Sequence, residues 1–523
     1  MTLLPPAALL TRLEGGYSNT TLLSSGARDL PPRQRTLRGA LTWSYDLLTP
    51  EEQALFRRLS VFVGGCTLEA AEAVCVEPGN LEIDVLGGLA SLIDKSLLRP
   101  VDQQDAEPRQ RMLETVREYA LDLLEESGEA ADLRMRHAAY YLALAEEAEP
   151  KLTGPEQAAW LDRLEREHNN LRAALRRSRD GGKVKVGLRL AAALWRFWYM
   201  RGYLSEGRDW LESILAAAPL SAGSDKGARA RALNGVGVLA YMQGDYRQAT
   251  KSYEESLALR RELGDTRGVG ASLYNLGNLA RDQGDLARAA ALLEESLTLY
   301  RGLGDTWLIA GALHGLGEVA RYQGDLERAA TLLQESLVLR RTLGNRQAIA
   351  ISLDALSNVA LARGEFEHAE MLYVESSALY EALRDAQGQA HALNNLAKVR
   401  RFQGNYRQAF LLYAKSLRLY RSLGKKLGMA WCLEGIAGVA TVSGQKVQAA
   451  RLFGAAAQLR DVINAPLLPN DRVAHDHDVT LVRAALGDAL FATAHAAGAA
   501  TLPEQAVDEA LTIADDAIQK REE

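Results

Sequence analysis

The chain has 523 residues, enough for several domains, and its 47% hydrophobic content is enough to form buried cores. A formal charge of −6, from 61 Lys and Arg against 67 Asp and Glu, excludes the overall basic excess that is typical of nucleic-acid or membrane-surface binders. Three scattered cysteines, the absence of a basic, apolar leader and the lack of a long apolar run predict a cytoplasmic protein with no membrane partner.

The first part of the chain is predicted to contain short helices followed by two strands. "TLRGALTWSYDLLTPEEQALFRRLSVF" predicts two helices joined at Thr49-Pro50, with Thr49 as the N-cap. "TLEAAEAVC" predicts a short helix after Gly64-Gly65, and "DVLGGLASLIDKSLLRPV" predicts a helix that runs into a strand. "RQRMLETVREYALDLLEES" predicts a second strand and a long helix. Helices followed by a two-stranded ribbon and a closing helix are typical of a winged helix, which we assign to residues 41–130.

A winged helix that reads DNA needs several basic side chains on its recognition helix. The predicted third helix offers Lys95, and its Asp84 and Asp94 would repel phosphate. Arg109 and Arg111 could contact a DNA backbone from the wing, or could simply keep a strand edge soluble. The sequence therefore disfavours DNA binding through this domain.

A forty-residue period begins after a change of composition near residue 180. We assign residues 131–182 to a helical linker that ends at "RSRDGGKVKVG". Beyond it, one phrase returns at constant spacing, which is the signature of a solenoid. The glycines of this phrase are Gly244, Gly284, Gly324, Gly364, Gly404 and Gly444, and its alanines are Ala249, Ala289, Ala329, Ala369, Ala409 and Ala449.

Each unit of this period is predicted to be an antiparallel helix pair. Apolar and small residues share one face of a first helix, and Gly284-Asp285 supplies a left-handed turn and an N-cap. A second helix then runs to Gly304-Asp305. Gly277 and Ala289 are expected where the two helices cross, because a larger side chain would hold the backbones apart.

This unit resembles the tetratricopeptide repeat, whose Leu-Gly, Gly and Ala pattern appears here as Leu276-Gly277, Gly284 and Ala289. The departure is length, since the usual repeat has about 34 residues. The predicted fold class is mainly α: a winged-helix domain, then an α-solenoid of forty-residue tetratricopeptide-like helix pairs over residues 183–465, and a helical C-terminal cap over residues 466–523.

A stripe of polar, charged and aromatic residues runs beside the packing face of the first helix in each pair. Such side chains on a concave wall suit a protein or peptide partner, although they could also be solvated faces of exposed helices. Asp354 lies on the same stripe. The predicted groove residues are Tyr274, Asn278, Arg281, His314, Glu318, Arg321, Tyr322, Asn358, Asn394, Lys398, Arg401 and Phe402.

A second resemblance rests on longer stretches. "ARDLPPRQRTLRGALTWSYDLLTPEEQALFRRLSVFVGGCTLEAAEAVC" resembles the segment downstream of the nucleotide-binding core in STAND-type signal-transduction ATPases, with AfsR-like and LuxR-like bacterial regulators as the nearest branch. "WLDRLEREHNNLRAAL" and "AARLFGAAAQLRDVINAPLLPNDR" are also similar to stretches of those proteins. The resemblance implies that residues 1–40 are a remnant of the NTPase helical subdomain, that the winged helix holds an ATPase core closed, and that the repeats sense a partner.

The catalytic features of that family are missing from the sequence. The phosphate-binding loop G-x-x-x-x-G-K-[ST] does not occur, and Met112-Leu113-Glu114 stands where the family often has Met-His-Asp. His475 and His477 lie close to Asp471, Asp476 and Asp478, but we predict a solvated loop there rather than a metal site. The sequence therefore predicts no cofactor, no metal and no enzymatic activity.

The function predicted from the sequence is a non-catalytic regulatory protein that binds a protein or peptide in the repeat groove and acts in transcriptional regulation. Two alternatives stay open. One is a winged-helix transcriptional regulator that binds DNA. The other is a C-terminal subunit or fragment of a split ATPase regulator, whose partner would be a separate NTPase module.

Overall fold

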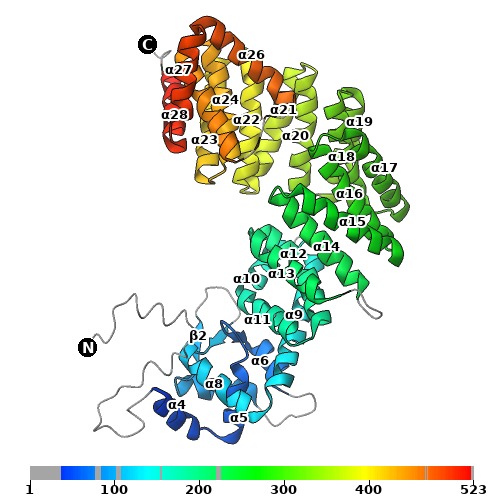
Figure 1. Ribbon diagram of the computed structural model, residues 1–523, viewed down its shortest axis with the longest axis vertical. Coiled ribbons are helices and arrows are strands. Elements are labelled where there is room, and N and C mark those ends of the chain that lie inside the picture. The colour runs from blue at the N-terminus through cyan, green and yellow to red at the C-terminus, as the bar shows by residue number, and fades with distance from the viewer. Residues whose placement is uncertain are drawn as a thin grey trace, which may run out of the picture. The chain divides into compact units, whose positions relative to one another are not determined.

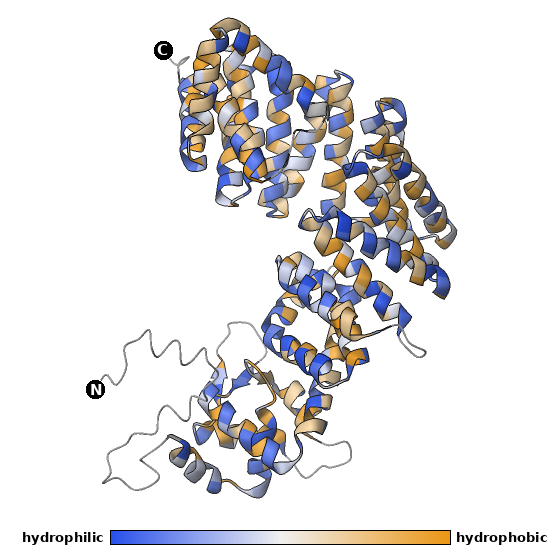
Figure 2. Cartoon of the chain, viewed as in Figure 1, coloured by the Kyte–Doolittle hydropathy of each residue, from blue (hydrophilic) through white to orange (hydrophobic). Residues whose placement is uncertain are grey.

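A computed structural model describes residues 37–76, 84–101, 108–153, 156–219, 225–463, 465, 467 and 469–519. Residues 1–36, most of the predicted remnant segment 1–40, lie outside the described residues. The chain divides into two compact units, Met1–Asp265 and Thr266–Glu523 (Figure 1). Figure 2 shows polar and apolar residues side by side along the helices, as expected of amphipathic helices that pack on one face.

The first unit contains the winged-helix elements and a run of antiparallel helices. The winged-helix part comprises α4 (Leu37–Asp46), α5 (Pro50–Leu59), β1 (Cys66–Thr67), α6 (Leu68–Cys75), α7 (Val85–Asp94), β2 (Arg99–Val101), β3 (Arg109–Arg111) and α8 (Glu114–Ser127). The helices that follow are α9 (Ala130–Lys151), α10 (Gln157–Arg166), α11 (His168–Asp180), α12 (Val184–Arg201), α13 (Leu204–Ala217), α14 (Lys226–Met242) and α15 (Tyr246–Leu263).

The start of α5 confirms the predicted cap. The Thr49 hydroxyl accepts a hydrogen bond from the backbone N–H of Glu52 at 3.3 Å, and the Glu52 carboxylate accepts one from the N–H of Thr49 at 2.9 Å. These reciprocal bonds satisfy backbone donors that the first turn of a helix leaves free. Pro50 occupies the first turn, where its missing N–H costs nothing.

The predicted two-stranded ribbon is present, because β2 pairs antiparallel with β3, but the sheet also has a third strand and the order is β1-β3-β2. β1 pairs antiparallel with β3, with Cys66 opposite Gln110. Gly65, at φ +97°, allows this approach, because an added Cβ there would lie 2.5 Å from the Gln110 carbonyl oxygen. A strand of two residues is too short to show an alternating pattern, so β1 could not be predicted from the sequence.

The predicted linker near residue 180 is short. α11 ends at Asp180 and α12 begins at Val184, so residues 181–183 alone connect two helices that pack on each other. One hydrophobic core continues across this connection, from Leu41 in α4 to Leu259 in α15.

The second unit is a stack of helix pairs closed by three further helices. The pairs are α16 (Thr266–Asp282) with α17 (Leu286–Leu303), α18 (Thr306–Gln323) with α19 (Leu326–Leu343), α20 (Arg346–Ala362) with α21 (Phe366–Ala382), α22 (Ala386–Phe402) with α23 (Tyr406–Ser422), and α24 (Lys426–Val442) with α25 (Lys446–Val462). The closing helices are α26 (Pro469–Leu486), α27 (Asp488–Ala499) and α28 (Pro503–Gln519).

The predicted turn chemistry is confirmed in this stack. Gly284 has φ +83° and Gly324 has φ +84°, the left-handed conformation that glycine adopts without steric cost. Asp285 caps α17 by accepting a hydrogen bond from the N–H of Arg288 at 3.1 Å. The same turn therefore recurs between paired helices.

The two helices of a pair approach closely through small residues, as predicted. A Cβ added at Gly277 would lie 2.7 Å from Cγ of Leu293, which is closer than real contacts allow. A buried serine on the second helix also donates to a carbonyl oxygen of the first helix. These bonds run from Ser296 to Gly270 at 2.9 Å, from Ser336 to Ala310 at 2.8 Å and from Ser416 to Ala390 at 2.7 Å.

The C-terminal helices pack back onto the repeats. α27 crosses α25 at two glycines, since an added Cβ on Gly454 would lie 2.0 Å from the His495 carbonyl oxygen. α28 lies beside α23 (Figure 1), where Arg418 pairs with Asp515 at 3.0 Å. None of the helices in the described residues is both long and apolar enough to cross a membrane.

The prediction of a loop around His475 is wrong, because this residue lies within α26. Val479, Val482 and Leu486 recur at helical spacing and pack against the core of the last repeats. Among the described residues, no group of three or more His, Cys, Asp or Glu side chains could hold a metal ion.

We predict that the buried serine bonds stabilise the helix pairs. Ser296→Ala and Ser336→Ala should each lower the free energy of unfolding by about 1 kcal/mol, because each removes a buried donor. Thr298→Ala is the control, since the exposed Thr298 hydroxyl bonds a carbonyl of its own helix. It should change stability by less than ~0.5 kcal/mol. Urea unfolding followed by circular dichroism measures the difference, and equal effects of the serine and threonine changes would contradict the prediction.

Candidate functional site

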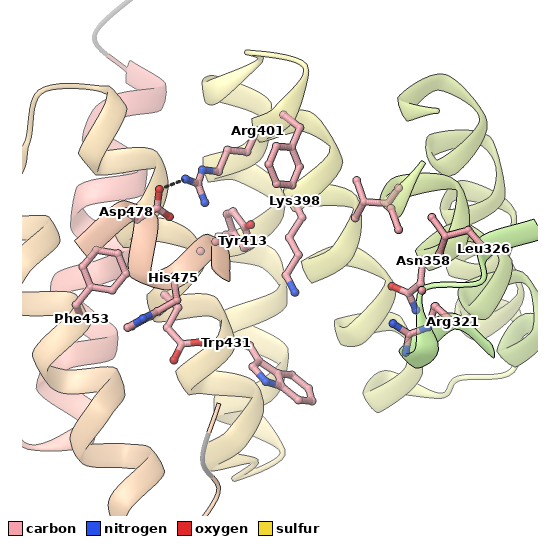
Figure 3. Close-up of a pocket in the computed structure, with 17 residues that line it drawn as sticks. Arg321, Leu326, Asn358, Lys398, Arg401, Tyr413, Trp431, Phe453, His475 and Asp478 are labelled. Atoms are coloured by element: carbon pink, nitrogen blue, oxygen red, sulfur yellow. Dashed lines mark hydrogen bonds and ion pairs between the residues drawn. The ribbon is translucent and has the colours of Figure 1, made fainter. Parts of the chain in front are cut away.

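The second unit contains a chamber of about 490 Å³, which we call the α26 chamber. Its walls come from first and second helices of successive pairs and from α26, which brings His475 and Asp478 to one side (Figure 3). The lining residues are Arg321, Gly324, Leu326, Asn358, Leu361, Ala362, Lys398, Arg401, Phe402, Tyr413, Trp431, Glu434, Gly435, Phe453, Ala474, His475 and Asp478.

The forty-residue period explains why these side chains meet. Asn358 and Lys398 occupy the same position in successive repeats, and Arg321 and Arg401 occupy the same position in repeats two periods apart. In each first helix the two positions lie three residues apart, so they share one face of the helix. Stacking the pairs then brings equivalent faces together along one wall.

An ion pair attaches α26 to the repeats. Arg401 Nη2 lies 2.6 Å from Asp478 Oδ1, and the side chains are only 17% and 5% exposed (Figure 3). Gly438 on α24 makes room for this pair, because an added Cβ would lie 2.4 Å from Arg401 Nη1. The pair is enclosed by protein and is therefore screened less by salt than a surface pair.

Two further ion pairs fix the positions of charged side chains at the chamber. Arg460 donates to Glu434 from Nε at 2.6 Å and from Nη2 at 2.9 Å. Arg321 lies 2.8 Å from Glu318. Burial raises the pKa of the Glu318 carboxyl, but the hydrogen bond from Arg321 and the positive charges nearby together outweigh burial, so the pKa of Glu318 is lowered. Glu318 is therefore held ionised, and the wall offers oriented charge pairs to a ligand.

Aromatic side chains supply the apolar part of the chamber. Phe402 is 52% exposed and stacks on Phe366 with ring centroids 6.0 Å apart. Phe453 meets the His475 ring edge-on at 5.2 Å, and Trp431 packs against Tyr420 at 6.3 Å. Rings fixed by neighbours lose little conformational entropy when a ligand covers them.

Eleven of the twelve predicted groove residues divide into three groups. Arg321, Asn358, Lys398, Arg401 and Phe402 line the α26 chamber. Tyr274 lines a second, smaller pocket. Asn278, Arg281, His314, Glu318 and Tyr322 line neither pocket, although Arg281 donates to Asn278 at 3.1 Å and the Arg321 guanidinium lies 4.2 Å from the Tyr322 ring.

Asn394 does not face a groove, and Asp354 is also buried. Asn394 is 1% exposed and donates to Asn395 at 3.3 Å, while Asp354 accepts hydrogen bonds from Ser376 and Tyr380. This position of the first helix turns toward the second helix of the same pair. Some residues of the predicted stripe are therefore buried inside the helix pair and do not face a groove.

Sequence reasoning missed the chamber residues that come from other elements. His475 and Asp478 belong to the segment that was predicted to be a loop, although their spacing of three residues fits one helical face. Tyr413 and Phe453 lie on second helices. Aromatic residues there are as common in a hydrophobic core as in a binding site, so their type alone did not indicate a site. The remaining lining residues that were not predicted are Gly324, Leu326, Leu361, Ala362, Trp431, Glu434, Gly435 and Ala474.

Two basic side chains of the winged helix, Lys95 and Arg109, are held by carboxylates. Lys95 Nζ lies 2.7 Å from Glu52. The hypothesis that Arg109 contacts DNA from the wing is wrong, because Arg109 is 4% exposed and pairs with Glu167 on the segment that follows the winged helix. Tyr141 and Asn170 donate to the same carboxylate at 2.9 and 2.8 Å, so this cluster joins the sheet to the helices behind it.

Two family models match the chain, a winged helix-turn-helix domain over residues 48–125 and a MalT-like TPR region over residues 212–410. Parts of the chain are therefore similar to a winged helix-turn-helix domain and to a MalT-like TPR region. The TPR match covers the helix pairs that carry Tyr274 to Phe402. The fold class predicted from the sequence is confirmed.

Relatives match parts of this chain. A Mycobacterium tuberculosis protein, provisionally named an HTH-type transcriptional regulator, is 45% identical over 194 residues, which is 37% of this chain and 22% of the relative. An uncharacterized protein of the same organism is 35% identical over 135 residues, or 26% of this chain and 33% of the relative. The chain thus spans about a fifth to a third of the length of these relatives.

Two solved structures align with much of this chain at low sequence identity. A STAND protein with a tetratricopeptide repeat sensor from Pyrococcus horikoshii aligns with a TM-score of 0.48 and 14% identity, over 85% of this chain and 67% of that one. A Rap protein complexed with competence and sporulation factor aligns with a TM-score of 0.49 and 12% identity, over 73% of this chain and 99% of that one.

We predict that the Arg401–Asp478 pair holds α26 against the chamber. Asp478→Asn should reduce the free energy that protects the α26 amides by about 1–3 kcal/mol, because the buried guanidinium loses its counter-charge. Asp476→Asn is the control on the same helix, since the Asp476 side chain is 64% exposed. Hydrogen exchange of residues 469–486 measures both variants. Equal protection in the two would show that the pair does not anchor α26.

Proposed function

We propose that the chain is a non-catalytic regulatory protein that binds a short peptide, or a peptide segment of a protein partner, in the α26 chamber. One observation carries the proposal: ion pairs and aromatic rings from successive helix pairs converge with α26 on a single chamber of about 490 Å³. Each of these groups is positioned by the fold before a ligand arrives, which lowers the entropic cost of binding.

The volume of the chamber supports a ligand with several side chains. Sites for small molecules and peptide groups occupy roughly 300–1,000 Å³. Leu326, Leu361 and Ala362 add aliphatic surface to the lining of the chamber. A peptide could therefore place an apolar side chain at this surface while its backbone meets the polar groups.

The chemistry of the lining also favours a peptide. Trp431, Phe402 and Phe453 offer ring surface, and Asn358 and Lys398 offer hydrogen-bonding groups. Aromatic residues and arginine dominate the energetic centres of protein recognition surfaces. Enclosed ion pairs would reject a ligand whose polar groups do not match them, which gives specificity.

The regulatory part of the proposal is supported by the comparisons. The chain pairs a winged helix-turn-helix domain with a MalT-like TPR region, and relatives over part of its length carry the provisional name of transcriptional regulators. We infer that ligand binding in the repeats controls a regulatory output. A separate NTPase module is the further partner that the STAND-type resemblance implies.

DNA binding through the winged helix is the second candidate function, because the domain match favours it. The charges argue against it. Lys95 is engaged by Glu52, and Arg109 is buried against Glu167. Arg99 and Arg111 stay exposed, but two phosphate contacts add little affinity at physiological salt. Peptide binding in the repeats is therefore the proposal that we favour.

The test is selection of peptides on the purified full chain. A library of random peptides of about ten residues should yield enriched sequences, whose affinity is then measured by fluorescence polarisation. Trp431→Ala and Phe402→Ala should weaken binding at least about tenfold, or about 1.4 kcal/mol, because each removes ring surface from the chamber.

Met371→Ala is the matched control for that selection. Met371 is 65% exposed on α21 and does not line the chamber, so its loss should leave affinity unchanged. The proposal fails if no peptide is enriched, or if enriched peptides bind the Trp431→Ala and Phe402→Ala variants as tightly as the unmodified chain.

A further inference from the structure

A second pocket of about 160 Å³ lies between the α16–α17 pair and the α18–α19 pair. None of its lining residues lines the α26 chamber. Its walls are largely aromatic, and Gly311 contributes no side chain, with open space where its Cβ would be. We call it the Arg340 pocket; it is lined by Tyr274, Tyr300, Trp307, Leu308, Gly311 and Arg340.

Arg340 is a buried cation without a carboxylate partner among the described residues. The residue is 8% exposed. Nη1 donates to the Ala348 carbonyl oxygen at 2.9 Å and to the Ser352 hydroxyl at 2.8 Å. No described residue accepts a hydrogen bond from Nε or Nη2. A guanidinium out of water without a counter-charge is costly to bury, and here two donors on one edge of it remain available.

In other repeats, the residue equivalent to Arg340 has a carboxylate partner on the first helix of its pair. In two of them, a polar residue on the second helix bonds a carboxylate located 26 residues earlier on the first helix. Arg460 donates to Glu434 at 2.6 and 2.9 Å, and Tyr380 donates to Asp354 at 3.0 Å. Arg340 occupies the equivalent position in its own repeat, so a carboxylate is expected at residue 314.

Residue 314 is a histidine, and it cannot supply that negative charge. Its Nδ1 atom is buried without a hydrogen-bond partner in the described residues. Burial and the nearby charge of Arg340 lower the pKa of His314 to about 3. The imidazole is therefore neutral at physiological pH, and the repeat holds a cation beside a neutral ring.

We propose that the Arg340 pocket binds a carboxylate carried by a ring-sized aromatic group. The two free donors on one edge of the guanidinium match the two oxygens of a carboxylate in a bidentate pair. A cavity of about 150 Å³ is known to accommodate benzene, so the volume fits one ring. Trp307, Tyr274 and Tyr300 would pack against that ring.

A free aromatic acid and the C-terminal residue of a peptide share this chemistry. Isothermal titration calorimetry of the purified full chain distinguishes them with two probes, phenylacetate and the peptide Gly-Gly-Phe with a free C-terminus. Each probe has a neutral counterpart, phenylacetamide and the amidated peptide. At least one acid should bind ten times or more tighter than its amide, and the tighter acid identifies the source of the ligand.

Variants separate specific binding from a general effect. Arg340→Gln should weaken binding at least tenfold. Gly311→Leu should do the same while keeping Arg340, because Gly311 lines the pocket and an added Cβ there meets no atom within 4 Å. His314→Glu should also block the probe, since it supplies the internal carboxylate found in the α24–α25 repeat. Arg341→Gln is the control, because Arg341 lies on the surface and pairs with Glu375.

Circular dichroism confirms that each variant is folded, so Gly311→Leu tests the pocket even if Arg340→Gln does not fold. The proposal is overturned if neither acid gives saturable binding, if the amides bind as tightly as the acids, or if Gly311→Leu binds as the unmodified chain does. Binding of inorganic phosphate at equal strength would also overturn it, because a ring would then contribute nothing. The result does not depend on the α26 chamber, whose variants Trp431→Ala and Phe402→Ala should bind these probes normally.

Discussion

The close contact inside each helix pair is the constraint on which the repeat region depends. Glycine or alanine at the crossing lets the two backbones approach, and a buried serine hydroxyl then reaches a carbonyl of the first helix. Neither helix could bury its apolar face alone. The two helices of a pair therefore bury apolar surface against each other, and each pair buries its remaining apolar surface against the next pair. The polar faces of the first helices are positioned as a consequence.

Variation at one position determines what each repeat can hold. Glu434, Asp354 and His314 are equivalent residues, each placed against the second helix of its own pair. Where the residue is acidic, a tyrosine or arginine is satisfied within the repeat. Where it is His314, the charge of Arg340 stays uncompensated beside a pocket. The same architecture therefore provides an internal bond in one repeat and a candidate binding site in another.

Much of the fold could be predicted because its signals are local and repeated. The glycine turns, the Asp285 and Thr49 caps and the Gly277 crossing follow from residue chemistry at fixed spacing. β1 escaped prediction because two residues carry no pattern, and its pairing with β3 is made between distant segments.

The candidate site was harder to predict than the fold. Periodicity shows which residues share a helix face. Because neighbouring residues differ by about 100° around the helix axis, a residue at the edge of that face can point either to solvent or to the paired helix. Asn394 and Asp354 are buried against neighbouring helices, whereas Lys398 and Asn358 line the chamber. The α26 residues come from outside the repeats, so the period gave no information about them.

The most direct test of this account is the stability of Gly277→Leu compared with Gly302→Leu, measured by urea unfolding. Gly277 lies at the helix crossing, whereas Gly302 has no atom within 4 Å of an added Cβ. The account predicts a loss of at least about 1–3 kcal/mol for Gly277→Leu. Gly302→Leu should show no loss and up to about 1 kcal/mol of gain from helix propensity. Equal unfolding midpoints for the two variants would contradict the claim that close helix contact holds the repeats together.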